Sequence, residues 1–315
     1  MNNKKVTVIG GGHGQALMCR GLKEIEGIDL TAIVTVADDG GSTGRLRRQF
    51  HIPAMGDIRN VMVSLAASES LMRELMDYRF IDPLGTEEDI AGHNLGNLIL
   101  TALTEQTGSF MEAIQEAGKV LNVKGTIIPA TTEVITLYAG MDDGVIVKGE
   151  ASIPGYGHHI ERVFYDRTVE AQEEAVAAIE ESDYVIYGIG SLYTSILPNV
   201  IIPGISEALR HTKARCIYFC NAMSQPGETD GYSMEDHVRA LEDHGGRVDE
   251  VVFAEDEIPE EILKRYSNRG STHIDMREND HDYEVIPCQL LSFKDGYIRH
   301  DSDKIRKVSQ LLLEK

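Results

Sequence analysis

The chain has 315 residues, and its 51 acidic and 30 basic side chains give a formal net charge of −21 at pH 7. Such a negative molecule repels nucleic-acid backbones and anionic lipid, so we expect no nucleic-acid partner. No apolar stretch approaches the ~20 residues that a membrane helix requires, so we expect no membrane insertion. An anionic small ligand would need backbone N–H groups and a local basic cluster to hold it.

Short β-branched runs alternate with segments of helical period along the chain, which is typical of parallel βαβ units. Helical spacing predicts helices over 17–25 and 95–103, followed by helices at 170–181, 235–243 and 303–315. The apolar runs are too continuous for a half-exposed sheet and therefore predict buried central strands. These strands are expected at residues 6–9, 31–36, 184–188, 216–220, 251–253 and 285–290.

The stretch 133–150 has a different pattern, because its apolar residues alternate around Asp142-Asp143-Gly144. An Asp-Gly pair between alternating runs predicts an antiparallel hairpin. We expect the chain to form a single α/β domain over 1–315, with a small hairpin elaboration around 125–165.

Four cysteines, at positions 19, 216, 220 and 288, show no C-x-x-C spacing and no histidine arrangement of a zinc site. So few cysteines in a chain of this length need no disulfide framework and suit a reducing compartment. We therefore expect a cytoplasmic protein.

The first strand leads directly into Gly10-Gly11-Gly12-His13-Gly14, which opens the first helix. Amide groups and the helix dipole favour an anion at this position. The run is not the dinucleotide fingerprint G-x-G-x-x-G, because Gln15 occupies the position of the third glycine. A tight strand-to-helix turn without any ligand is the alternative explanation.

A second glycine-rich loop, Asp38-Asp39-Gly40-Gly41-Ser42-Thr43-Gly44, follows the second strand and leads into Arg45, Arg47 and Arg48. These arginines are the basic cluster that the acidic composition requires. Asp38 is open to three interpretations: it binds a ribose hydroxyl, it binds Mg²⁺ together with Asp39, or both belong to a solvated turn.

Four further segments place small and polar residues after strands or at helix starts, at 56–60, 92–97, 188–195 and 221–231. Ligands of doubly wound sheets bind outside the carboxyl ends of strands at a topological switch point, so these segments are expected to border one crevice. His93, at a helix N-terminus, is a candidate neutral donor to a ligand oxygen or a structural residue.

The segments AIVTVADDGGSTGRLR, GDIRN, GHNLGNLIL, GSLYTSILPN, CNAMSQPGETDGYS and GYIRHD, in this order, resemble the YvcK-like proteins called gluconeogenesis factors. These belong to the group that contains the CofD-type 2-phospho-L-lactate transferases. The first loop departs from that family, whose usual GGGTGL is replaced here by GGGHGQ. The resemblance implies a Rossmann-like three-layer fold with a mostly parallel central sheet.

The resemblance also implies a role in carbon partitioning, cell shape and envelope-precursor supply, with binding of a UDP-sugar such as UDP-N-acetylglucosamine. The alternative is a Mg²⁺-dependent nucleotidyl or phospho-group transferase, as in the transferase relatives. A nicotinamide oxidoreductase is disfavoured by the missing third glycine. No nucleophile-base-acid triad is evident, so whether the protein is an enzyme stays open. Mg²⁺ is the one cofactor candidate, and a regulatory protein partner and a homo-oligomer are further expectations.

Tyr266 is a candidate for stacking on a base, as the resemblance allows, or for packing within its helix. Asp38 is the candidate metal ligand. The candidate ligand-binding residues are Gly11, Gly12, His13, Gly14, Asp38, Asp39, Gly41, Ser42, Arg45, Asn60, His93, Asn94, Asn97, Gly190, Ser191, Asn221, Gln225, Thr229, Tyr266 and Arg299.

Overall fold

The computed structural model describes residues 3–67, 71–81, 85, 89–278 and 280–314, and the statements below concern this part of the chain. Its main sheet is built from parallel strands. These are β1 (Lys4–Gly10), β2 (Ile28–Val34), β3 (Thr126–Pro129), β7 (Tyr184–Tyr187), β8 (Arg215–Phe219), β9 (Glu250–Ala254) and β10 (Glu284–Cys288).

The strand order of this seven-stranded sheet is β10-β9-β8-β7-β1-β2-β3. The chain builds outward from β1 in one direction as far as β3 and then returns to the other side of β1 with β7. The topological switch point therefore lies between β1 and β7, which pair in register from Val6 with Tyr184 to Ile9 with Tyr187. In an open α/β sheet this is where ligands bind.

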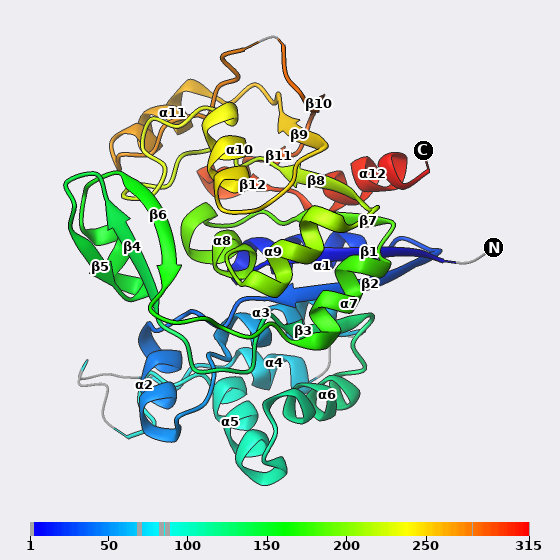
Figure 1. Cartoon of the computed structure of the whole chain (residues 1–315), viewed down its shortest axis with the longest axis vertical. Helices are drawn as coiled ribbons and strands as arrows, with labels where there is room; N and C mark the ends of the chain where they lie inside the picture. Colours follow the sequence, from blue (N-terminus) through cyan, green and yellow to red (C-terminus); the bar gives the residue numbers. More distant parts are fainter. Residues whose placement is uncertain (1–2, 68–70, 82–84, 86–88, 279, 315) are drawn as a thin grey trace.

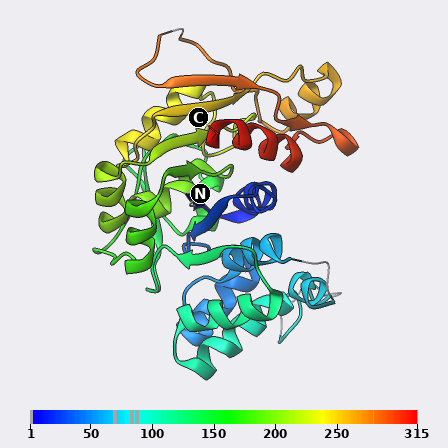
Figure 2. The same cartoon turned by 90° about the vertical axis from the view of Figure 1, so that its right-hand side faces the viewer.

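Helices cover both faces of the sheet, which makes the mostly parallel α/β prediction correct (Figure 2). One face carries α1 (Gly12–Leu22) and α12 (Ser302–Leu313), and the other carries α7 (Glu173–Glu181), α8 (Leu197–Val200) and α9 (Pro203–His211). Because both faces are covered, the strands are continuously apolar, and all four residues of β7 are buried.

The helices between β2 and β3 gather at one end of the molecule (Figure 1). They are α2 (Gly41–Phe50), α3 (Gly56–Leu65), α4 (Leu71–Asp77), α5 (Leu95–Thr107) and α6 (Phe110–Leu121). Toward the other end lie α10 (Met234–Asp243), which begins in a capping box at Ser233, and α11 (Glu260–Ser267). None of the helices in the described ranges combines the length and apolar character that a membrane crossing requires.

The predicted hairpin is present and gains a third strand. Strands β4 (Leu137–Met141) and β5 (Ile146–Lys148) meet at the Asp-Gly turn, and β6 (Ile160–Tyr165) pairs with the other side of β4. This antiparallel sheet lies beyond the carboxyl edge of the main sheet (Figure 1). The short 3-10 helix η1 (Glu150–Gly155) follows β5 and contacts the loop after β2.

The structure contains one strand that the sequence did not predict, and it places one predicted strand at the edge of the sheet. Residues 126–129 form β3, an edge strand too short and too close to Gly125 for its pattern to stand out in the sequence. The strand expected at 285–290 is β10, which is an edge strand with intermediate or exposed side chains instead of a central one. The two-stranded ribbon of β11 (Leu291–Ser292) and β12 (Arg299–His300) follows it.

Candidate functional site

The glycine-rich turn after β1 lies against the turn after β7, at the switch point. A Cβ added to Gly14 would lie 1.7 Å from the carbonyl oxygen of Ile189, so only glycine permits this approach. Asn199 of α8, which is fully buried, donates from Nδ2 to the carbonyl oxygen of Gly10 at 3.0 Å. The two turns are thus held together by close backbone contact and a buried amide.

The loop after β8 contacts the turn after β7 through two side-chain amides. Asn221 donates from Nδ2 to the carbonyl oxygen of Gly190 at 2.8 Å, and Gln225 donates from Nε2 to Ser191 Oγ at 2.6 Å. Thr229 is fully buried and accepts the backbone N–H of Gln225 at 2.9 Å, which shapes the loop. The segments around 10, 190 and 225 therefore converge, as expected from the sequence.

Gln15, which replaces an apolar residue of the family pattern, has a structural role. Its side chain is fully buried, and Nε2 donates to the carbonyl oxygens of Val8 at 3.1 Å and Ile33 at 2.8 Å. The amide therefore bridges β1 and β2 beneath the glycine turn. His13, the other departure, is exposed and lines a cavity described below.

The loop after β2 is tied to the start of α5 by a buried group of polar side chains. Ser42 Oγ lies 2.9 Å from His93 Nδ1 and 3.3 Å from Asn97 Nδ2, and it accepts the backbone N–H of Asn94 at 3.2 Å. Asn94 also caps α5 by accepting the backbone N–H of Asn97. These contacts give Ser42, His93 and Asn97 a structural role at the base of the crevice.

Carboxyl groups from several segments gather beside the glycine turn. A Cβ on Gly11 would lie 2.6 Å from Asp57 Oδ2, and one on Gly56 would lie 2.8 Å from Asp38 Oδ2. From η1, the backbone N–H of Ala151 donates to Asp39 Oδ1 at 3.0 Å. The hairpin sheet therefore brings η1 against the acidic loop.

Three acids at this edge of the sheet, Asp57, Glu150 and Glu228, have raised pKa values. Burial, followed by the charge of Asp38, raises the pKa of Asp57 to about 7. Burial, followed by the charges of Asp38 and Asp57, raises the pKa of Glu150 to about 8. Burial also raises the pKa of Glu228 to about 7. Together, Asp38, Asp39, Asp57, Glu150 and Glu228 form what we call the carboxylate cluster, which sequence reasoning identified only at Asp38 and Asp39.

A cavity of about 730 Å³ opens at the first turn of α1. Its basic side chains come from α1, α3, the segment after α4, and β12. The residues that line it are His13, Gly14, Ala16, Leu17, Arg20, Arg59, Asn60, Val63, Asp77, Arg79, Asn94, Ile189, Arg299 and His300. We call it the arginine cavity, because four guanidinium groups face a single carboxylate there.

The basic side chains that line the cavity are not the arginines that the sequence suggested, Arg45, Arg47 and Arg48. Arg47 is buried and donates to the backbone oxygens of Ala37 and Asp38, so it supports the loop from inside. Arg45 donates from Nη2 to the carbonyl oxygen of Ala91 at 2.6 Å. Arg20, Arg59 and Arg79 were not assigned from the sequence, because no spacing along the chain reveals that α1, α3 and residue 79 meet.

The remaining candidate residues lie on α11, on β12 and at the start of α2. Tyr266 of α11 exchanges hydrogen bonds with the backbone of Ile298, at 3.0 Å and 3.3 Å, next to β12. Arg299 stacks its guanidinium over the ring of Tyr297 at 5.5 Å. Gly41, at the first position of α2, has φ +43°, and nothing lies within 4 Å of a Cβ built on it.

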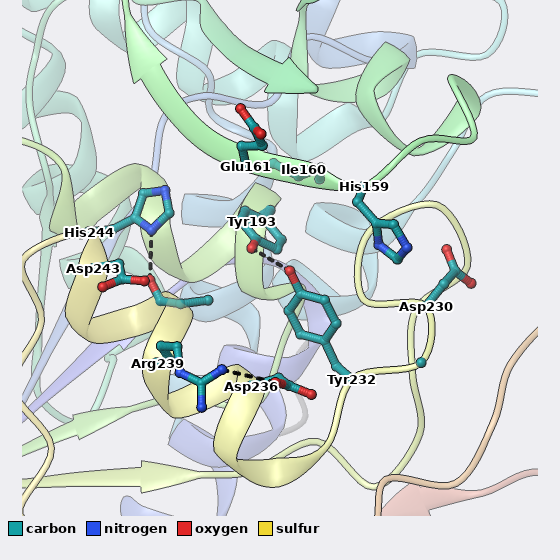
Figure 3. A pocket seen from close by; sticks show the side chains of 12 residues that line it. His159, Ile160, Glu161, Tyr193, Asp230, Tyr232, Asp236, Arg239, Asp243 and His244 are labelled. Atoms are coloured by element: carbon teal, nitrogen blue, oxygen red, sulfur yellow. Dashed lines mark hydrogen bonds and ion pairs between the residues drawn. The ribbon is translucent and has the colours of Figure 1, made fainter. Parts of the chain in front are cut away.

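A second cavity, of about 360 Å³, lies between β6 and α10 (Figure 3). The hydroxyl groups of Tyr193 and Tyr232 meet in it at 2.7 Å. Its acidic lining is Glu161, Asp230, Asp236 and Asp243, with Arg239 paired to Asp236 at 3.5 Å. These carboxylates would repel a phosphate group, so the arginine cavity is the better anion site.

Comparison with known proteins shows the family of the chain. The family model of the 2-phospho-L-lactate transferase CofD matches residues 6–291, which is most of the chain. The chain belongs to the CofD family. A gluconeogenesis factor of Bacillus subtilis (strain 168) is 43% identical over 98% of both chains, and a putative gluconeogenesis factor of Thermotoga maritima is 41% identical over 96% of this chain and 98% of its own.

Two solved structures share the whole architecture of this chain. A crystal structure of a Bacillus halodurans protein superposes with a TM-score of 0.92 at 41% identity and covers 98% of this chain and 99% of its own. A second crystal structure from that organism, described as a member of the upf0052 family, gives a TM-score of 0.91 at 40% identity, covering 97% of this chain and 99% of its own. The resemblance to gluconeogenesis factors is therefore confirmed.

Proposed function

We propose that this CofD-family chain binds a nucleotide-sugar of the UDP-N-acetylglucosamine type and acts as a regulatory protein. The observation that carries the proposal is the arginine cavity, which opens at the start of α1 in a molecule of net charge −21. Four guanidinium groups line this cavity together with the first residues of α1, and such a lining suits a pyrophosphate in an otherwise repulsive field.

Different residues of the cavity are suited to different parts of the ligand. The amides at His13 and Gly14, together with Arg59, are positioned to hold phosphate oxygens, while Asn60 and Asn94 offer amides to sugar or ribose hydroxyls. Arg299 is the residue that we assign to the base or the sugar, with Tyr266 supporting β12 from behind.

Calorimetry and ligand-dependent melting with UDP-N-acetylglucosamine test this proposal. Ligand at 100 times its dissociation constant should raise the free energy of unfolding by about 2.7 kcal/mol. Arg299→Gln should weaken binding by about tenfold or more, because a hydrogen bond to a charged group is lost. Arg210→Gln on α9 is the matched control and should bind normally. Absence of stabilisation by every uridine nucleotide would reject the proposal.

A second candidate is a Mg²⁺-dependent nucleotidyl or phospho-group transferase, favoured by the carboxylate cluster. Mg²⁺ is commonly held by one or two carboxylates plus substrate phosphates, and Asp38 and Asp57 provide such a pair beside the Gly11–Gly12 turn. A bound Mg²⁺ would supply charge neutralisation for phosphoryl transfer. Within the described ranges, one group of three side chains brings its potential metal-ligand atoms within 4.8 Å of one another. It consists of Asp142, Asp143 and His158, which are exposed and lie at the end of the hairpin sheet.

Incubation with labelled nucleoside triphosphates and sugar phosphates decides between sensing and turnover. A transferase should give a Mg²⁺-dependent product that Asp38→Asn abolishes, whereas a sensor should bind ligand without product. We further propose that the protein acts in the cytoplasm on carbon partitioning, cell shape and envelope-precursor supply. A protein partner or a homo-oligomer would carry the signal. The names of the curated relatives support the gluconeogenic part of this role.

A further inference from the structure

One guanidinium of the arginine cavity is already paired with a carboxylate of the protein. Arg59 Nη1 lies 2.5 Å from Asp77 Oδ1, and Arg59 Nη2 donates to Asn60 Oδ1 at 2.6 Å. The Arg59 side chain is 9% exposed, whereas that of Asp77 is 56% exposed. Both residues line the cavity, so the pair joins a buried cation to an acid that reaches solvent.

Packing holds Arg59 in place. A Cβ on Gly96 would lie 2.7 Å from Arg59 Cδ and 2.5 Å from the carbonyl oxygen of Met76, so the arginine stem runs through a gap that only glycine leaves open. Asp77 is the last residue of α4, and its carboxylate has no such enclosure. Of the two partners, Asp77 is the one that can turn away.

The pair has opposite consequences for the empty and the occupied cavity. Burial lowers the pKa of Arg59, so a nearby anion stabilises its charged form when no ligand is present. When phosphate oxygens reach Arg59, they supply that negative charge themselves. Asp77 then becomes a like charge beside the phosphate, and repulsion in a partly buried site is strong.

We propose that Asp77 sets the affinity of the arginine cavity for anionic ligands by competing with the ligand phosphate for Arg59. This inference rests on the proposed function. Ligand entry displaces the carboxylate, so occupancy of the cavity is coupled to the C-terminal end of α4. This competition lowers the affinity for anionic ligands and leaves the affinity for uncharged ligands unchanged.

Calorimetry on the full chain with inorganic pyrophosphate, UDP-N-acetylglucosamine and uridine tests the inference. Asp77→Asn removes the charge and retains an oxygen for Arg59. It should bind pyrophosphate and UDP-N-acetylglucosamine about tenfold more tightly than the unaltered protein, while the response to uridine stays the same. Glu181→Gln is the matched control, because it neutralises an acid paired with Lys5 at the amino edge of the sheet, and it should change nothing.

Each other outcome has a distinct meaning. Equal or weaker binding of the charged ligands by Asp77→Asn, with normal binding by the unaltered protein, overturns the inference and leaves the proposed function intact. An equal gain for uridine and pyrophosphate indicates general loosening and also overturns it. If neither protein binds any of the three probes, the proposed function fails and the inference with it. Asp77→Ser provides the same comparison if Asp77→Asn melts at a much lower temperature.

Discussion

Side-chain amides hold the loops of the crevice together, and a glycine lets two of the loops approach closely. Asn199 and Asn221 donate to backbone oxygens of the glycine turns, and Gln225 donates to Ser191. The Gly10 carbonyl oxygen also accepts the backbone N–H of Thr35 at 2.9 Å, so the Asn199 amide adds a second hydrogen bond at this strand end. Gly14 contributes by lacking a side chain, since it lets two turns touch. Polar residues of this crevice therefore serve the architecture as well as the ligand.

Gly14→Ala should be severely destabilising. Its Cβ would lie 1.7 Å from the carbonyl oxygen of Ile189, so one of the two turns must move. We expect the free energy of unfolding to fall by about 2–4 kcal/mol and the ligand response to vanish. Chemical denaturation measures this. Gly155→Ala, where a Cβ meets nothing within 4 Å, should stay within about 0.5 kcal/mol, and similar losses in both variants would contradict the explanation.

At the scale of elements, several chain segments bring their polar ends to one edge of the sheet. The turns after β1 and β7 supply glycines, the loop after β2 supplies Asp38, and η1 of the hairpin sheet supplies Glu150. Both the arginine cavity and the carboxylate cluster border the start of α1, and Asp57 interacts with Arg59 and Asn60 of the cavity lining. Guanidinium groups and carboxylates close together suit a ligand with phosphates and, in the second candidate function, an accompanying cation.

The carboxylate cluster predicts a pH dependence of stability. The folded pKa values of Asp57 and Glu150 are raised to about 7 and about 8, from ordinary values of 3.8 and 4.5. Raised values mean that folding favours the protonated acids, so this stabilisation is complete below about pH 4 and is lost as the pH rises through 7 to 8. We expect the ligand-free protein to melt several degrees lower at pH 8 than at pH 5.5.

Differential scanning calorimetry at the two pH values measures this difference. Asp57→Asn should reduce the pH dependence, because it removes one of the repelling charges, and Mg²⁺ should raise the melting temperature more at pH 8 than at pH 5.5. Glu173→Gln, which neutralises an exposed acid in the first turn of α7, is the control and should retain the full pH dependence. A melting temperature that rises toward pH 8 would contradict the assignment.

At the scale of the whole molecule, the hairpin sheet contacts the helices and loops of the main sheet at several points. His244 after α10 accepts the backbone N–H of Val163 in β6 at 3.1 Å. A Cβ on Gly227 would lie 1.9 Å from the carbonyl oxygen of Pro154, so η1 packs directly on the loop after β8. These contacts lead us to propose that residues 1–315 fold as one domain, in which the hairpin sheet closes one end of the crevice.

A single domain should unfold in one cooperative transition. We expect the circular dichroism signal and the calorimetric heat to report the same midpoint, with equal calorimetric and van't Hoff enthalpies. His244→Ala should lower that midpoint without splitting the transition, because it weakens the junction between β6 and α10. An early transition that involves only the hairpin sheet would instead show two independent units.

The sequence by itself determined the elements and the chemistry of their ends. Continuous apolar runs defined the central strands, the Asp-Gly turn defined the hairpin, and glycines after β1, β2 and β7 marked the crevice, because these signals depend on near neighbours along the chain. The tertiary structure decided which charges meet. Arg20, Arg59, Arg79 and Arg299 lie far apart in sequence, and Asp57 and Glu150 join Asp38 only because the strand order and the hairpin sheet place them there.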